Sequence, residues 1–375
     1  MKALLLSAYD ARSHHLWREH IKALCPHIQW QELVLPARYF AWRVRGNSLT
    51  WAFNHRDILA DNYDFLLCTS MTDLSALRGF APQLAQIPNI VYFHENQFAY
   101  PVNPQTEGAV SVEPQILSIY TALCADEIVF NSEFNRASFL RGARALLKKL
   151  PDHVPQGLNH RLEKASVIPV PLAQELFSTP RPYKGEEKTL NIVWNHRWEF
   201  DKGPGLLLAL VTVLIERHTR FRLHVLGQQF RQTPGPFETM LPLLKGYYEA
   251  HSITPGHWGY VQERSAYEAI VASADIALST ASHDFQGLAL LEATALGCTP
   301  LAPDCMAYPE YLPAEHLYPV SKALSDTARQ AADKIDHWAT MKTQGKTLPR
   351  VEVSQFSPAH LADAYRGLFS RVTRQ

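Results

Sequence analysis

The sequence has few cysteines, no excess of either charge and no long apolar run. Its five cysteines are scattered over 375 residues without a CxxC pair, which argues against a disulfide framework and favours a reducing, cytoplasmic environment. Basic and acidic residues number 36 each, so any site for a polyanion must be local. No apolar stretch approaches the length that crosses a bilayer, and we expect no membrane partner.

Short motifs of several large enzyme classes are also missing. There is no GxxxxGK[ST] phosphate loop, no GxGxxG dinucleotide fingerprint, no HExxH zinc motif and no DxD. What is present is an alternation of apolar runs and amphipathic stretches, which is typical of an α/β fold. Because the chain is too long for one ordinary core, we expect two α/β domains of similar size.

The most informative stretch, residues 283–297, reads HDFQGLALLEATALG. Apolar segments flank it, so the pattern predicts a strand, a glycine-containing loop, a helix and a further strand. A helix that begins near Gly287 would offer free N–H groups to a phosphate, and Glu292, one turn inside, has a carboxylate for a sugar hydroxyl. Taken alone, the pair of Asp284 and Glu292 is more often a surface turn followed by a solvated helix.

Cations flank the start of another predicted helix, near residue 204, which follows a strand over 190–194. Two cations and a helix N-terminus directed at one point suit a diphosphate. Further along, a strand ends in a glycine and a short strand or loop covers 257–261. From these positions the candidate donor-binding residues are Arg197, Lys202, Gly227, Tyr260 and Val261.

Polar residues follow several predicted strands of the first half, beginning with a strand over 3–8. Four polar side chains in a row, after a strand that begins at residue 90, are unusual for a structural turn. Ser13 is equally well explained as the N-cap of the helix that follows it, and Ser132 is expected to cap another. The candidate acceptor-binding residues at these strand ends are Ser13, His14, His94, Glu95, Asn96, Gln97 and Asn131.

Two stretches of the first half are rich in cations. Residues 38–53 combine Trp with Arg, which fits either an aromatic and cationic surface for a nucleobase or phosphate or an ordinary strand or hairpin. Residues 136–164 form the most basic stretch; such a run is usually a solvated helix face, but a local basic strip is also how a neutral protein binds RNA phosphates. The candidate RNA contacts there are Arg141, Arg144, Lys148 and Lys149.

These features divide the chain into three parts. We expect a Rossmann-like domain over 1–177, which carries the candidate acceptor-binding residues, and a second Rossmann-like domain over 178–356, which carries the candidate donor-binding residues and opens with a proline-rich linker over 178–188. A last helix, 357–375, has Ser357 as its cap and proline at its first position. A crossing of this helix back to the first domain is one option.

Several stretches resemble the tRNA-queuosine mannosyltransferases, glycosyltransferase-like proteins of GT-B type. They are LPA with WR over 35–43, YFHENQ with YP over 92–101, VFNSEFN over 129–135, PDH over 151–153, NHRWE-DKG over 195–203 and STA-HDFQG-LLEA over 279–293. The spaced acids Asp284 and Glu292 resemble the E-x7-E signature of retaining GT-B enzymes of family 4. Asp284 stands where that family usually has Glu, one methylene longer.

The resemblance implies a GT-B fold, with two Rossmann-like doubly wound domains that face each other across a cleft. It implies GDP-mannose as donor, and as acceptor the cyclopentenediol of queuosine at the wobble position of tRNA-Asp. The new linkage would be α, formed with retention. It implies no metal or other cofactor, in agreement with the missing DxD.

The same resemblance implies roles for individual residues. Arg197 and Lys202 would neutralise the leaving diphosphate, with N–H groups of Gly287 and Leu288 on the same phosphates. Glu292 would hold the nucleotide ribose and Asp284 the donor-sugar hydroxyls. His94 would contact the donor sugar or orient the acceptor, so the expected catalytic residues are His94, Arg197, Lys202 and Asp284.

Two other readings stay open from the sequence. One is a GT-B glycosyltransferase with another nucleotide sugar or with a lipid or glycan acceptor, which should carry an amphipathic membrane face. The other is a non-catalytic RNA-binding relative, in which the basic and aromatic stretches would be the functional part.

Overall fold

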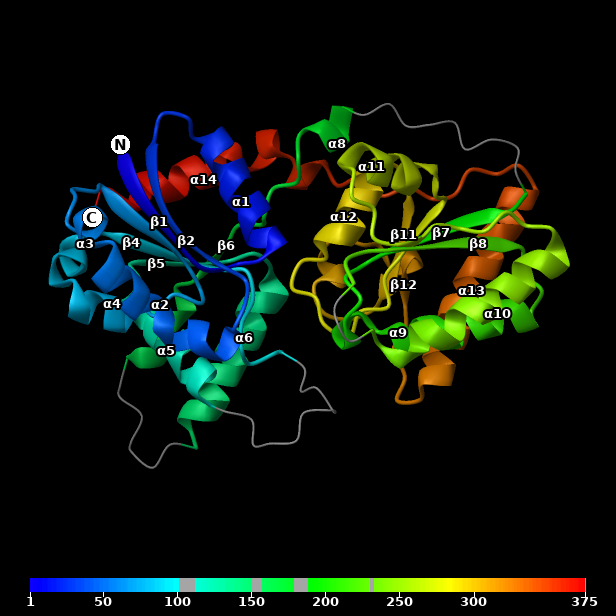
Figure 1. Cartoon of the computed structure of the whole chain (residues 1–375), viewed down its shortest axis with the longest axis horizontal. Helices are drawn as coiled ribbons and strands as arrows, with labels where there is room; N and C mark the ends of the chain where they lie inside the picture. The colour runs from blue at the N-terminus through cyan, green and yellow to red at the C-terminus, as the bar shows by residue number, and fades with distance from the viewer. Residues whose placement is uncertain (101–111, 150–156, 179–187, 230–232, 375) are drawn as a thin grey trace. The chain divides into compact units, whose positions relative to one another are not determined.

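The computed structural model describes residues 1–100, 112–149, 157–178, 188–229 and 233–374, and divides the chain into two compact units (Figure 1). Unit 1 comprises residues 1–173 and 356–375, and unit 2 comprises 174–355. The short helix α8 (Glu175–Ser178) packs on α12 in unit 2, so the first domain ends a few residues before the expected limit at 177. The expected linker over 178–188 falls outside the described residues from 179 to 187.

Unit 1 is built on a parallel sheet with the strand order β2-β1-β3-β4-β5-β6. The central strands β3 and β4 are buried along their whole length, as expected for strands covered on both faces. Parallel strands need crossovers, and helices supply them. The strands are β1 (Lys2–Asp10), β2 (Gln29–Pro36), β3 (Phe65–Thr69), β4 (Asn89–Phe93), β5 (Glu127–Phe130) and β6 (Ser166–Val167).

Right-handed crossovers decide which face each helix of unit 1 covers. The chain leaves β1 toward one edge and returns past it to β3, so α1 lies on one face and the later helices on the other (Figure 1). The helices are α1 (Arg12–Leu24), α2 (Phe40–Asn54), α3 (Arg56–Leu59), α4 (Leu74–Phe80), α5 (Glu113–Cys124), α6 (Glu133–Leu147) and α7 (Leu158–Glu163).

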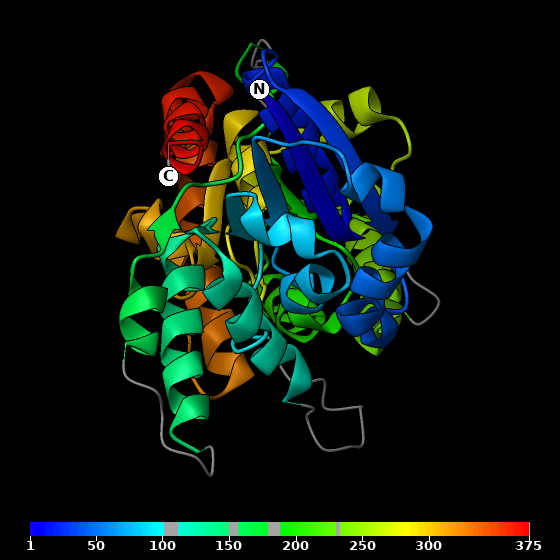
Figure 2. The ribbon, with the colours of Figure 1, turned by 90° about the vertical axis from the view of Figure 1, so that its left-hand side faces the viewer.

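The C-terminal helix α14 (Pro358–Val372), red in Figures 1 and 2, belongs to unit 1 and packs against α1. Its Tyr365 is fully buried, accepts a hydrogen bond from Trp17 Nε1 at 3.0 Å and donates one to the Pro169 carbonyl at 2.9 Å. The Ser357 side chain accepts from the His360 N–H at 3.3 Å, which confirms the predicted cap.

The segment from residue 38 to 53 was expected to be either a strand or hairpin, or a binding surface; the strand and the hairpin are wrong, because it forms α2. Its buried positions include Val44, Asn47, Ser48 and Trp51, a helical spacing. Two of the four are polar. Asn47 donates to the Met71 carbonyl at 3.1 Å and accepts from the Asp73 N–H at 3.0 Å. This buried polar residue interrupts the apolar pattern by which a helix is predicted from sequence.

Unit 2 has a second parallel sheet, in the order β12-β11-β10-β7-β8-β9. Strand order reverses between β7 and β10, and ligands of open α/β sheets bind at the carboxyl ends of strands at such a switch point. The strands are β7 (Leu190–Asn195), β8 (Phe221–Leu226), β9 (Trp258–Gly259), β10 (Ile276–Leu278), β11 (Thr299–Pro303) and β12 (Leu317–Tyr318).

The helices of unit 2 cover both faces of its sheet, as the reversal of strand order requires. The helix α9 packs against α10 and α13 on one face, while α11 and α12 lie on the other (Figure 1). Within the described ranges no helix is long and apolar enough to cross a membrane. The helices are α9 (Pro204–Glu216), α10 (Gly235–His251), α11 (Arg264–Ser273), α12 (Leu288–Ala295) and α13 (Leu324–Thr343).

Candidate active site

Every residue predicted to bind the donor lies at the carboxyl edge of the unit 2 sheet or at the start of α12. The loop after β7 holds Arg197 and Lys202, and the loop after β10 holds Asp284 and Gly287; these two loops meet at the switch point. The remaining residues follow neighbouring strands or lie in α12. They are Gly227 after β8, Tyr260 and Val261 after β9, and Leu288 and Glu292 in α12.

Hydrogen bonds join the two loops at the switch point. The Asp201 carbonyl accepts from the Ser282 N–H at 2.8 Å, and Thr280 Oγ1 donates to the Lys202 carbonyl at 2.9 Å. Gly203, with a φ of 68°, lies so close that a Cβ there would be 1.9 Å from the Thr280 carbonyl oxygen. Only glycine fits this approach, and the loops are therefore fixed relative to each other.

Lys202 is the central charge of this edge. Its ammonium lies 3.2 Å from Asp201, 3.7 Å from Asp284 and 2.8 Å from the His283 carbonyl, and its side chain is only 12% exposed. Burial opposes the charge, but the attraction of Asp284 and Asp201 outweighs it and raises the pKa of Lys202. Lys202 therefore keeps its positive charge in a nearly dry environment, where a charge acts most strongly.

Asp284 is held by more than the lysine. Its Oδ1 accepts from the Gly287 N–H at 3.1 Å and its Oδ2 accepts from the Tyr308 hydroxyl at 3.2 Å. Burial opposes ionisation, but Lys202 above all lowers the pKa of Asp284. The short aspartate side chain suits this hydrogen bond to a backbone N–H three residues on. Asp284 therefore helps to shape the turn.

The start of α12 is a helix N-terminus of the kind that binds anions, although its Gly287 N–H already donates to Asp284 Oδ1. Gly287 is the N-cap with a φ of 76°, and a Cβ there would lie 2.6 Å from the Tyr311 hydroxyl. The first N–H groups of a helix have no acceptor within it, and the helix dipole favours a negative charge at this end. Leu288 begins the helix, as predicted, so its N–H belongs to this group.

Sequence reasoning missed His196, which directly follows β7. It is 3% exposed, its Nε2 has no hydrogen-bond partner among the described residues, and burial lowers its pKa to about 4 against the opposing field of Asp284. A neutral, buried nitrogen without a partner beside charged groups is a place for a ligand hydroxyl. Its position after a buried strand was the available signal.

A second missed group comes from the loop after β11. Tyr308 is fully buried and shares a 2.7 Å hydrogen bond with Ser279 Oγ in addition to its bond to Asp284. Met306, in the left-handed region with a φ of 59°, accepts at its Sδ from the Asp284 N–H at 3.1 Å. Aromatic and polar residues after a strand were again the signal.

The other predicted donor contacts are nearer the surface or already paired. Arg197 is 47% exposed and lies 2.8 Å from Glu199. Glu292 is 15% exposed and lies 3.4 Å from Arg264. Tyr260 is 52% exposed. Gly227 has its space filled by backbone, since a Cβ there would lie 1.9 Å from the His196 carbonyl oxygen.

The carboxyl edge of the unit 1 sheet brings together His14 from α1 and His94 after β4. Their rings are in edge-to-face contact at 4.1 Å, and Trp17 and Tyr92 each lie 4.7 Å from His94. Burial lowers the pKa of both histidines, partly offset at His14 by Glu95. The Nε2 atoms of both lack hydrogen-bond partners in the described part of the chain.

The amides predicted to contact the acceptor at this edge have structural hydrogen bonds. Asn96 donates to Asn135 Oδ1 and Ser138 Oγ, both at 2.8 Å, and accepts from the Phe98 N–H at 2.9 Å. Asn131 donates to the His94 carbonyl at 2.9 Å. These bonds fix the loop that carries His94. The Gln97 side chain donates to Met71 Sδ at 3.9 Å, and the Gln97 carbonyl accepts from Gln115 Nε2 at 3.2 Å.

The two predicted caps of unit 1 have different outcomes. Ser132 accepts from the Asn135 N–H at 3.0 Å at the start of α6, as predicted. Ser13 is not a cap: α1 begins at Arg12, its N-cap is Ala11, and no side chain caps it. The helix begins two residues earlier than expected, which places Ser13 inside the first turn, beside the buried His14.

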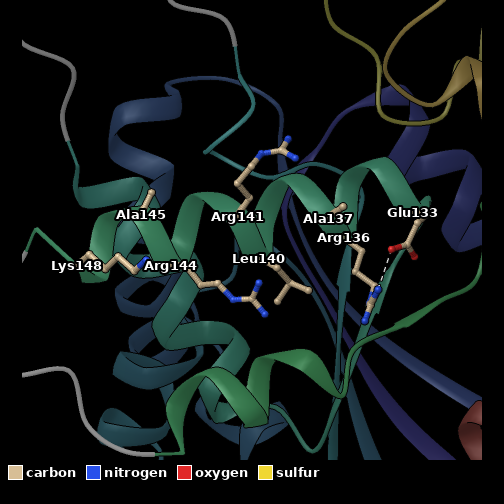
Figure 3. A pocket seen from close by; sticks show the side chains of 8 residues that line it. All are labelled: Glu133, Arg136, Ala137, Leu140, Arg141, Arg144, Ala145 and Lys148. Atoms are coloured by element: carbon tan, nitrogen blue, oxygen red, sulfur yellow. Dashed lines mark hydrogen bonds and ion pairs between the residues drawn. The ribbon is translucent and has the colours of Figure 1, made fainter.

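The basic residues of α6 line a pocket of about 560 Å³ (Figure 3). Arg144 pairs with Glu163, and Arg136 with Glu133 at 2.8 Å. Figure 3 shows the Arg141 side chain directed away from those of Arg136 and Arg144. The helix spans Glu133–Leu147, so Lys148 lies about 20 Å from the helix start, and the strip runs away from the sheet edge. The PDH stretch over 151–153 lies outside the described residues.

Two parallel doubly wound sheets, one in each half of the chain, are a feature of the GT-B fold. The HepE protein of Anabaena, solved with UDP, is similar over 99% of this chain and 100% of its own, with a TM-score of 0.64 at 13% identity. The E. coli trehalose-6-phosphate synthase solved with UDP-2-fluoro glucose has a TM-score of 0.59 at 13% identity, over 100% and 99%. These likenesses confirm the GT-B fold.

Sequence comparison is more specific. The family model described as tRNA-queuosine alpha-mannosyltransferase N-terminal matches residues 2–172. The tRNA-queuosine alpha-mannosyltransferase of Drosophila melanogaster is 32% identical over 352 residues, 90% of this chain and 88% of its own length. The chain is therefore a glycosyltransferase. It belongs to the tRNA-queuosine alpha-mannosyltransferase family.

Proposed function

We propose that this protein transfers mannose from GDP-mannose to the cyclopentenediol of queuosine at the wobble position of tRNA-Asp, with retention. The observation that carries the proposal is the 32% identity to the Drosophila mannosyltransferase over nearly the whole chain. The switch-point geometry of unit 2 supports the donor half of the reaction. The acceptor half is supported by the match of the family model to residues 2–172.

The leaving diphosphate is stabilised by three positive groups in this proposal. Lys202 holds a buried full charge, the N-terminus of α12 contributes its N–H groups, and Arg197 is exposed enough to close over the phosphates. Charge that develops on a leaving group is stabilised best by groups already in place, because little reorganisation is then needed. The hydrogen bonds between the two loops hold Lys202 and α12 in that arrangement.

Retention follows from front-face attack rather than from a covalent intermediate on Asp284. A carboxylate nucleophile must approach the anomeric carbon freely. Asp284 instead accepts from Gly287 and Tyr308, lies 3.7 Å from Lys202, and has a lowered pKa. Its remaining lone pairs suffice to accept a hydroxyl of the donor sugar, and His196 Nε2 offers a second polar atom for that sugar.

On unit 1, His94 is proposed to contact the sugar or the acceptor diol. Its Nε2 is a buried polar atom without a partner among the described residues, and burial keeps the ring neutral. A neutral imidazole nitrogen can accept a hydroxyl hydrogen or donate to a hydroxyl oxygen, depending on the tautomer. The tRNA phosphates would contact Arg141 of α6 and Lys148 and Lys149 directly after it; the ion pairs described on this helix involve Arg136 and Arg144 instead.

The reaction is proposed to need no metal ion. Within the described ranges, no group of three or more His, Cys, Asp or Glu side chains is arranged to bind one. The charge that a divalent cation would place on the diphosphate is assigned instead to Lys202, Arg197 and the α12 N-terminus. The nucleotide sugar and the tRNA are then the only partners the chemistry requires.

The test is mass spectrometry of nucleosides from tRNA-Asp carrying queuosine, incubated with the protein and GDP-mannose. The expected product is queuosine heavier by one hexosyl unit, absent with tRNA that lacks queuosine. UDP-glucose and UDP-mannose in parallel reactions test the donor base, and a Lys202→Met variant is the matched inactive control. Transfer from a UDP-sugar alone would revise the donor, and donor hydrolysis without a nucleoside product would reject the acceptor.

A further inference from the structure

The outer face of α2 carries a row of exposed apolar side chains. Trp42, Leu49 and Phe53 lie seven and four residues apart, a spacing that places them on one side of the helix. They are 56%, 41% and 58% exposed. Tyr39, at the N-cap of α2, is 74% exposed and takes the left-handed conformation, with a φ of 54°. A bulky residue rarely adopts that conformation, so the backbone of Tyr39 is strained while its ring is exposed to solvent.

Gly46 fixes the orientation of the Trp42 indole. A Cβ at Gly46 would lie 2.3 Å from Trp42 Cε2 and 2.6 Å from its Nε1. The indole therefore lies flat along the helix and leaves its other face open. Glycine inside a helix is unfavourable relative to alanine by roughly 1 kcal/mol, so the close contact with Trp42 is the feature of the structure that explains it.

The row is flanked by cations, and α2 itself contains no aspartate or glutamate; two acids from other elements, Asp73 and Glu113, pair with its Arg45. The Arg38 guanidinium lies 5.8 Å from the Tyr39 ring centre, and the Arg56 guanidinium 5.3 Å from that of Phe53. From residue 33 to residue 56 the chain has four arginines and no aspartate or glutamate. Not all four serve the surface: Arg43 is buried, and Arg45 lies 2.9 Å from Asp73.

We propose that this face, defined by Tyr39, Trp42, Leu49 and Phe53, binds unpaired bases of the tRNA anticodon loop by stacking. The inference rests on the proposed function, because a queuosine at the wobble position lies in that loop. Sequence-tolerant binding of single-stranded RNA combines open aromatic faces with arginines that stack or contact phosphates. Rings flanked by Arg38 and Arg56 and free of nearby acids along the helix provide that combination.

The experiment measures binding of a synthetic RNA hairpin with the anticodon stem and loop of tRNA-Asp. Trp42→Ala is expected to weaken binding about tenfold, since stacking of one base on an aromatic ring contributes roughly five- to a hundredfold in affinity. Trp42→Phe keeps a stacking ring, so its affinity should change less than about threefold. The quenching of tryptophan fluorescence when the hairpin binds should nevertheless be reduced in Trp42→Phe.

Gly46→Ala is a second, independent variant. It keeps every side chain of the row and favours the helix, but its methyl group displaces the indole. We expect weaker hairpin binding with thermal stability maintained. A Leu324→Ala variant, which removes an equally exposed side chain from unit 2, should bind as the wild type does. A fully paired RNA duplex should bind all variants equally, because it offers no unstacked bases.

The outcomes separate this inference from the proposed function. Wild-type protein that mannosylates tRNA while Trp42→Ala and Phe53→Ala bind the hairpin unchanged would overturn the stacking face alone. The face is also overturned if Trp42→Ala instead abolishes binding to lipid vesicles or converts a dimer to a monomer with unchanged RNA affinity. Wild-type protein that neither binds the hairpin nor modifies tRNA would overturn both proposals.

Discussion

The two sheets end in different chemistry. At the carboxyl edge of unit 2, Lys202, Asp201 and Asp284 form a buried network of full charges. At the same edge of unit 1, the corresponding place is occupied by the neutral rings of His14 and His94, packed on Trp17. Unit 1 also has a buried ion pair near this edge, where Arg18 of α1 lies 2.8 Å from Asp10 at the end of β1, but no lysine or arginine pairs with His14 or His94 among the contacts that the structure describes.

This difference matches the two halves of a glycosyl transfer. A departing diphosphate gains charge in the transition state and needs preorganised positive groups. A neutral sugar or diol needs polar atoms that can donate or accept without charge. The zero net charge of the whole chain does not reveal this division, because it reports the sum of the charges and not where they lie.

The largest effect should come from removing the charge at the switch point. Lys202→Met and Arg197→Ala should each lower turnover at least about a hundredfold, since one preorganised contact to developing charge contributes roughly 3 kcal/mol. Their stabilities should differ. Lys202 is buried against two carboxylates, so its loss should destabilise unit 2 by about 3–5 kcal/mol, whereas the half-exposed Arg197 should cost under about 1 kcal/mol.

The measurements are steady-state kinetics and urea unfolding followed in parallel. A loop cation that is exposed to solvent would have little effect on folding; the burial of Lys202 is the reason to expect one here. The double variant Lys202→Met with Asp284→Asn is the control, because removing both partners of the pair should restore part of the lost stability. Full activity in both single variants would remove the donor site from this edge.

The second effect is the dependence of folding stability on pH that the buried histidines cause. Burial lowers the pKa of His196 to about 4, whereas an unfolded histidine has a pKa of about 6.5. Between these values the unfolded chain binds more protons, so stability is unaffected above about pH 6.5 and falls as the pH drops toward 4. At pH 5 this one residue should account for about 2 kcal/mol of lost stability.

His196→Gln should therefore lose about 2 kcal/mol less than the wild type between pH 7 and pH 5. The groups facing His196 are Asp284, Lys202 and Asp201. The pKa of Asp284 is lowered and that of Lys202 is raised, so these two stay ionised over that range. His94→Gln tests the same property in unit 1, where burial also lowers the pKa. Two transitions should be fitted, since two units unfold. Equal pH slopes for wild type and His196→Gln would mean that His196 is hydrated.

The donor edge was largely predictable from sequence because its residues follow strands. A buried strand, a loop and a helix over 276–295 fix where Asp284, Gly287 and Leu288 must lie. What could not be predicted is the pairing within the edge, since Tyr308 and Met306 reach Asp284 from a loop about two dozen residues later. Such contacts depend on the packing of β10 beside β11 and have no local pattern.

In unit 1 the misreading of α2 has a physical cause. Its outer face is apolar, with Trp42 and Phe53 exposed, and its inner face contains the buried Asn47. A helix that lacks a clear polar face gives no 3.6-residue signal. The structural task of Asn96 after β4 was not predictable either, because the sequence does not show that this turn needs side-chain hydrogen bonds.

A smaller effect is expected from the basic residues of α6 in unit 1, which should affect tRNA binding without affecting donor binding in unit 2. Replacing Arg141, Arg144, Lys148 and Lys149 of α6 with alanine should weaken tRNA binding and flatten its salt dependence by a little under one unit per lost phosphate contact. Arg144 already pairs with Glu163, so the salt slope should change by less than the loss of four phosphate contacts would produce. GDP-mannose binding, measured by calorimetry, should stay as in the wild type; an unchanged salt slope would leave α6 as a solvated face.

The smallest expected effect is that of a chelator, and it bears directly on the comparison. If the diphosphate needed a divalent ion, the charges of unit 2 would have to bind cations, and its carboxylates would be the ligands. Asp201 and Asp284 are instead both turned to Lys202, which leaves the edge arranged for an anion. Turnover should therefore be unchanged in excess EDTA and unchanged again when magnesium or manganese is added. A loss with EDTA that either ion restores would show that the acids of this edge serve a metal, and Lys202 would then be their counter-ion instead of the phosphate contact.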